Sequence, residues 1–109
     1  MGIVKTANSR ARGFVQTLTE FEASNTYGVW YADSYENARY VVYSYGTHWP
    51  MFIFDGEKWY ENGDRASKTT SKHKNQLHPL CETEIRAVDD MCEIANRGVA
   101  DWMRRKLEN

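Results

Sequence analysis

The distribution of aromatic residues constrains the fold of this chain more than any other feature of its sequence. Fourteen of the fifteen aromatic side chains fall between Phe14 and Tyr60, interleaved with valine and threonine. Aromatic and β-branched residues are enriched in strands because they pack well on a pleated surface. We therefore expect an antiparallel sheet in this part of the chain, with strands over residues 14–22, 26–32, 39–45, 48–54 and 58–61.

Short polar segments between these strands predict tight turns. Asp55-Gly56 gives the clearest signal, because a type I′ hairpin turn needs positive φ at both central positions. Asn62-Gly63 repeats this chemistry, and Pro50 places the start of the fourth strand at a sheet edge or a bulge. Strands joined by short turns pair with their sequence neighbours. The expected product is a meander of four or five strands with one packed face and one partly wet face.

Residues 81–107 show the period of an amphipathic helix. Apolar side chains recur there at three- and four-residue steps, which places them on one helical stripe: Ile85, Val88, Met91, Cys92, Ala95, Val99, Trp102 and Met103. Gly98 lowers helix stability by ~1 kcal/mol relative to Ala. A close approach of the helix to the sheet or to a partner would explain why glycine occupies this position. The far end around Trp102 is a candidate surface for a homodimer. The alternative is that the whole stripe packs on its own sheet.

These patterns predict a single α+β domain within the 109 residues, in which a long C-terminal amphipathic helix packs on one face of the sheet. We expect a flexible basic arm over residues 1–13 and a domain over residues 14–109. Within the domain, residues 14–61 form the sheet, 62–80 a basic connector and 81–107 the helix. The connector is either an extended loop or a short helix capped by Thr70 or Ser71.

The formal net charge of −1 conceals an uneven distribution of charge. Residues 14–64 carry eight acidic side chains against two basic ones, whereas residues 65–80 carry four basic side chains and no acid. Because nucleic-acid binders are usually basic overall, the total argues against broad DNA binding but leaves room for a local anion site. No apolar run reaches the ~20 residues of a membrane helix, and we expect a cytoplasmic protein.

The cysteine and histidine residues match no standard metal or catalytic pattern. Cys81 and Cys92 would lie ~16 Å apart on one helix, too far for a disulfide, so two free thiols and a reducing compartment are expected. His73 and His78 do not complete a zinc site with them. A Cys–His dyad is conceivable, but core packing of the cysteines explains them better. We expect no cofactor, no metal and no catalytic activity.

The connector contains the most unusual stretch of the sequence. Hydroxyl groups there alternate with lysines and a histidine, a combination that donates to phosphate or carboxylate oxygens. The functional interpretation is an anion or nucleic-acid site, and the alternative is a solvated connector whose hydroxyls cap local turns. The candidate residues are Lys68, Thr69, Thr70, Ser71, Lys72, His73 and Lys74.

The aromatic side chains exceed what one small core obviously uses. Tyrosine and tryptophan are favoured at protein interfaces and also stack on bases. Cross-strand aromatic pairing is the structural alternative. The candidate partner-binding residues are Trp30, Tyr31, Tyr43, Tyr45, Trp49, Trp59 and Trp102.

Residues 26–79 resemble a family of small bacteriophage and mobile-element proteins without an assigned activity. The resemblance lies in Tyr43-Ser44-Tyr45-Gly46-Thr47, Pro50, Trp59, Asn62 and Ser67, and in Thr69-Thr70-Ser71-Lys72-His73. It implies a non-catalytic accessory protein in a bacterial cytoplasm. The first hypothesis is therefore that the protein binds a host or defence-system protein, as an inhibitor or adaptor. The second is that the connector binds nucleic acid or a nucleotide, with help from Arg10, Arg12 and a stacking aromatic.

Overall fold

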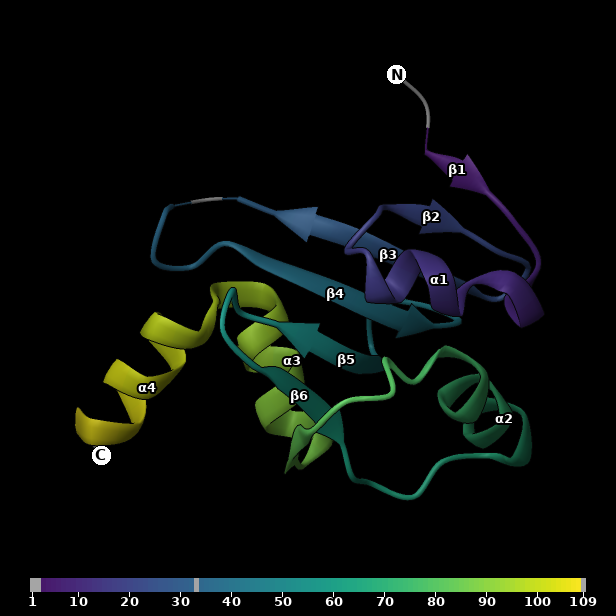
Figure 1. Cartoon of the computed structure of the whole chain (residues 1–109). Coiled ribbons are helices and arrows are strands. Elements are labelled where there is room, and N and C mark those ends of the chain that lie inside the picture. The colour runs from purple at the N-terminus through teal and green to yellow at the C-terminus, as the bar shows by residue number, and fades with distance from the viewer. Residues whose placement is uncertain (1–2, 33, 109) are drawn as a thin grey trace.

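The fold is α+β and is built on a seven-stranded mixed sheet, seen in a computed structural model that describes residues 3–32 and 34–108 (Figure 1). The strands lie side by side in the order in which they occur in the chain. Their bounds are β1 Val4–Lys5, β2 Phe21–Glu22, β3 Thr26–Tyr31, β4 Arg39–Ser44, β5 Pro50–Phe54, β6 Trp59–Asn62 and β7 Thr83–Arg86. Strands β2 to β6 form an antiparallel meander, while the two outer strands run parallel to their neighbours.

Helices cover both faces of this sheet, which corrects the expected single packed face. A short 3₁₀ turn, α1 and α2 pack against one face, and α3 and α4 against the other. The helices are η1 Asn8–Arg10, α1 Arg12–Gln16, α2 Lys68–Leu77, α3 Val88–Arg97 and α4 Val99–Glu108. Helices α2 and α4 lie at opposite ends of the molecule (Figure 1).

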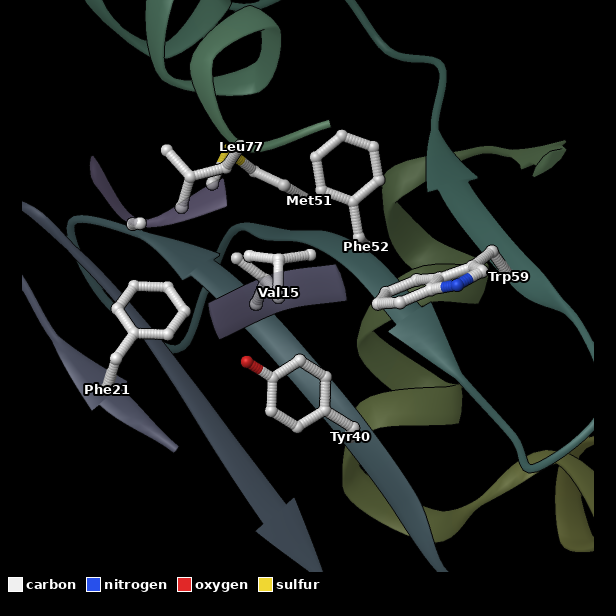
Figure 2. Packing of buried hydrophobic residues seen from close by; sticks show 9 residues of the cluster. Val15, Phe21, Tyr40, Met51, Phe52, Trp59 and Leu77 are labelled. Carbon is white, nitrogen blue, oxygen red and sulfur yellow. The ribbon is translucent and has the colours of Figure 1, made fainter. Parts of the chain in front are cut away.

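Alternation along the strands creates two separate hydrophobic cores. In β4, Tyr40 and Val42 point to the α1/α2 face, whereas Val41 and Tyr43 point to the α3/α4 face. Figure 2 shows the first core, in which Val15 of α1 and Leu77 of α2 converge on rings from the sheet. Two buried faces explain why the sequence needs so many large side chains.

The N-terminal segment differs from the expected arm and first strand. Residues 12–16 form α1 where a strand was predicted, and only Phe21–Glu22 is extended. Strand β1 pairs with β2, and Ala11 is fully buried. The expectation of an arm outside the domain is therefore wrong for the described residues up to 13. A helix of one turn is too short to show a 3.6-residue period in the sequence.

The C-terminal segment is not one helix over residues 81–107. Thr83–Arg86 extends the sheet beside β6, and Ile85 is 62% exposed rather than part of the apolar stripe. Gly98, with φ of +93°, separates α3 from α4. Ile85 lies three residues before Val88, which is a helical spacing. The sequence therefore shows a helical period in a segment that forms a strand.

Two turn predictions have a clear outcome. The chain reverses at Asp55-Gly56 between β5 and β6, as expected, although only Gly56 has positive φ. The turn is therefore not type I′. The Asp55 carboxylate instead accepts hydrogen bonds from the backbone N–H groups of Glu57 and Lys58, both at 2.8 Å. Pro50 begins β5 beside a register shift between Val42 and Tyr43, whereas the sequence left a sheet edge or a bulge open at this proline.

Candidate functional site

The basic connector folds into helix α2, which decides between the two conformations that the sequence left open. The helix begins at Lys68, and its N-cap is Ser67 rather than Thr70 or Ser71. The Ser67 hydroxyl accepts a hydrogen bond from the Thr70 backbone N–H at 3.2 Å, and so satisfies one of the donors that every helix start leaves open.

Two of the predicted anion-binding residues point into the protein and attach α2 to the sheet. Thr70 and His73 are buried, with 8% and 3% of their surface exposed. The Ser44 hydroxyl lies 2.9 Å from Nδ1 of His73 and donates to the Thr70 hydroxyl at 3.3 Å. These groups form a buried hydrogen-bond network between β4 and α2.

The second ring nitrogen of His73 faces the N-terminal 3₁₀ turn. Its Nε2 lies 3.4 Å from the Asn8 side-chain nitrogen, and the Asn8 oxygen accepts from the Thr26 hydroxyl at 2.8 Å. Burial, and then the charge of Lys72, lower the pKa of His73. A neutral His73 thus joins three segments that are distant in the sequence.

The opposite side of α2 presents the remaining predicted residues to solvent. Lys68, Thr69, Ser71 and Lys72 are exposed. Lys68, Ser71 and Lys72 border an open hollow of about 650 Å³, together with Arg12 from α1. None of the described residues that line this hollow is acidic. The fold therefore brings a third cation, more than fifty residues away in the sequence, to the two lysines.

Arg12 also completes the C-terminal end of α2. Its Nε donates to the His78 carbonyl at 3.0 Å, and its guanidinium donates to the Asn75 carbonyl. Cations near a helix C-terminus satisfy its last carbonyl groups and interact favourably with the dipole. Arg12 is thereby held at the hollow by the helix that it helps to form.

Lys74 differs from the other lysines of α2 because a carboxylate neutralises it. Its Nζ lies 2.9 Å from the Glu61 carboxylate, which also accepts from the Thr83 hydroxyl at 2.6 Å. Burial alone would raise the pKa of Glu61, but the bonds from Thr83 and Lys74 outweigh it and lower that pKa. Lys74 therefore fastens α2 to β6 and contributes little positive charge to the surface.

The predicted aromatic surface is divided by the two helical layers. Tyr43, Trp59 and Trp102 are buried, so the structure does not present them to a partner. Tyr31 and Trp49 are half-buried. Trp30 and Tyr45 are exposed, at 38% and 57%. The sequence could not separate these groups, because the helices that cover the second sheet face were not predicted.

Ser44, Asn8, Thr26 and Arg65 were not predicted as site residues. A signal for Ser44 was present, because strand alternation places this polar side chain on the same face as Tyr40 and Val42. A polar residue at an inward strand position usually has a buried hydrogen-bond partner. Asn8 and Thr26 had no such signal, since their contacts depend on the path of the N-terminal segment.

The cysteines and acidic residues form no further centre in the described part of the chain. Cys81 precedes β7 and is exposed, while Cys92 lies in α3 and donates weakly to the His48 carbonyl; both are free thiols. This corrects their expected placement on one helix. Within residues 3–32 and 34–108, no three metal-ligating side chains come together. No helix there is long and apolar enough to cross a membrane.

Comparisons with known proteins were made against family models, curated proteins and solved structures, and none of them matches this chain. The geometry around α2 is therefore the basis for assigning a function.

Proposed function

We propose that this protein binds nucleic acid by its phosphate backbone, through the basic surface formed by Arg12, Lys68, Ser71 and Lys72. The observation that carries the proposal is the hollow of about 650 Å³ that these residues border without a lining carboxylate. Lysine and arginine side chains supply most phosphate contacts, and hydroxyl groups add donors without sequence preference.

The net charge of the chain does not oppose this function, because the charges are separated in space. Lys68 and Lys72 have no ion-pair partner among the described residues, whereas Lys58, Lys74 and Lys106 each lie within 4 Å of a carboxylate. Uncompensated cations beside one another attract a polyanion more strongly than the same charges would in ion pairs.

A salt titration tests the proposal. Fluorescence anisotropy of labelled single strands and duplexes should show affinity that falls as salt rises, because bound cations release counterions from the phosphates. Three cations predict a slope of log affinity against log salt of about −2 to −3. Absence of binding at low salt, or affinity independent of salt, would contradict the proposal.

A second candidate function is the binding of a host or defence-system protein, as the resemblance to small phage proteins implies. The observation that favours it lies on α4, where Met103 and Leu107 are 51% and 88% exposed. They border a hollow of about 260 Å³ beside Trp102, where Arg86 is paired with Glu84. An exposed apolar patch suits a partner that presents apolar side chains.

The α4 surface is tested with a Leu107→Glu variant. A host protein captured by the wild type but not by this variant would support the second candidate. Arg97→Glu, on the exposed end of α3, is the control and should retain the captured protein. Equal capture by the wild type and Leu107→Glu would argue against α4 as the docking surface. A light-scattering mass of two chains that returns to one chain in Leu107→Glu would instead assign this surface to a homodimer.

A further inference from the structure

A second hollow lies beside the N-terminal end of α2, next to the basic surface. It measures about 330 Å³, within the range of about 300–1,000 Å³ typical of small-molecule sites. Tyr45, His48 and Trp49 line it from the loop between β4 and β5, and Arg65 lines it from the segment before α2. Ala66 lines both this hollow and the basic one, so the two are contiguous.

Backbone hydrogen bonds hold the loop that carries these three rings. The Ser44 N–H donates to the Trp49 carbonyl at 3.1 Å, and the Trp49 N–H to the Gly46 carbonyl at 3.3 Å. The Tyr45 N–H donates to the Asn25 carbonyl at 2.7 Å, which ties the loop to the β2–β3 turn. Tyr45 and His48 are exposed on this short, hydrogen-bonded loop, whereas Trp49 is half-buried and packs against the first core.

Tyr45 has a strained backbone that keeps its ring at the surface. Its φ is +68°, an outlier for a bulky residue. Such strain costs of the order of 1–3 kcal/mol and clusters at functional sites. The Tyr45 ring lies 5.4 Å from the His73 ring, centroid to centroid, yet Tyr45 stays 57% exposed. The ring is thus supported from below by the buried network while much of its surface remains open.

These observations lead to an inference that rests on the proposed function. We infer that the protein takes single-stranded nucleic acid, with an unpaired base stacked on Tyr45 in the second hollow and the adjoining phosphates on Lys68, Lys72 and Arg12. Aromatic side chains stack on any base, which gives affinity without sequence preference. Arg65, which lines the second hollow, supplies a further cation. A duplex keeps its bases stacked inside, so it would contact only the lysines and Arg12.

The matched variants are Tyr45→Asn, Tyr45→Phe and Tyr35→Asn. Asparagine tolerates positive φ and so removes the ring without adding backbone strain, phenylalanine keeps the ring, and Tyr35 is a fully exposed tyrosine in another loop. Anisotropy is measured with a labelled single strand of roughly 12 nucleotides, as DNA and as RNA, and with a duplex of equal length. Unfolding curves verify that each variant is folded.

Tyr45→Asn should weaken single-strand binding by roughly 5- to 100-fold, the loss of one stacked base. Duplex affinity and the salt slope should stay unchanged, and Tyr45→Phe and Tyr35→Asn should bind as the wild type does. The wild-type chain should also photo-cross-link to a 5-bromouracil single strand at Tyr45, His48 or Trp49, a result that needs no variant.

Salt-dependent binding that Tyr45→Asn leaves intact would overturn this inference while retaining the proposed function. So would cross-links confined to other residues, or equal losses for single strand and duplex. Absence of binding by every strand would contradict the proposed function itself. Preference for the RNA or the DNA strand identifies which single-stranded polymer the site takes.

Discussion

Nδ1 of His73 lies 2.9 Å from the Ser44 hydroxyl, and this buried contact fixes α2 against the centre of the sheet. The contact determines which side of the basic helix faces solvent. With His73 and Thr70 turned inward, Lys68, Ser71 and Lys72 are turned outward. His73, which the sequence suggested as a ligand-binding group, thus orients the residues that we propose to bind.

Protonation of His73 is expected to destabilise the fold. Its pKa in the folded protein lies below the ordinary value of about 6.5, so the unfolded chain binds the proton more readily. Stability should be complete above pH 6.5 and should fall as the pH drops toward the folded-state pKa. Urea unfolding between pH 7 and pH 5 measures this loss. His73→Gln should remove part of the pH dependence, whereas His48→Gln, at an exposed position, should retain it.

Gly98→Ala is expected to lower the free energy of unfolding by about 2–3 kcal/mol. Gly98 has φ of +93°, and an added Cβ would lie 2.4 Å from the Asn37 side chain. That side chain accepts a hydrogen bond from the Asp101 N–H at 3.1 Å and so caps the start of α4. The control is Gly13→Ala in α1, where nothing lies within 4 Å. It should stabilise the protein by about 0.5–1 kcal/mol, and equal effects of the two changes would refute this account.

Arg39→Lys is expected to cost about 1–3 kcal/mol of stability although it keeps the charge. Arg39 is buried, and its Nε and Nη2 both donate to the Ala95 carbonyl, at 3.0 and 2.7 Å. A lysine ammonium cannot reproduce this forked contact between β4 and the end of α3. Chemical unfolding should show the loss, while Arg97→Lys, on the exposed end of α3, should stay within about 0.5 kcal/mol of the wild type.

Sequence patterns were sufficient for the central strands but not for the elements at either end. The aromatic and β-branched run Tyr40-Val41-Val42-Tyr43 predicts a strand, and Asp55-Gly56 predicts the reversal after β5. Strand β7 could not be found in this way, because its pairing with β6 depends on contacts across more than twenty residues. The α1 turn was too short for its period to show.

The candidate site was predictable in its chemistry but not in its geometry. The hydroxyl-rich basic stretch at residues 68–74 predicts an anion site, and four of its seven residues are exposed. Which side chains turn inward depends on Ser44 of β4 and Asn8 of the 3₁₀ turn, which only the tertiary fold brings to α2. The same holds for Arg12, which joins the lysines through its contacts with the end of the helix.

We propose that one side of α2 binds nucleic acid while the other side attaches the helix to the sheet. A pair of lysine substitutions, one on each side, tests this most directly. Lys72→Gln should weaken oligonucleotide binding and reduce the salt slope by about 0.7–0.9, with the free energy of unfolding unchanged. Lys74→Gln should lower the free energy of unfolding by about 1–2 kcal/mol, because the partly buried Glu61 carboxylate loses its ion pair with Lys74, and should leave binding unchanged. Equal losses of affinity in the two variants, or a loss in Lys74→Gln alone, would contradict the account.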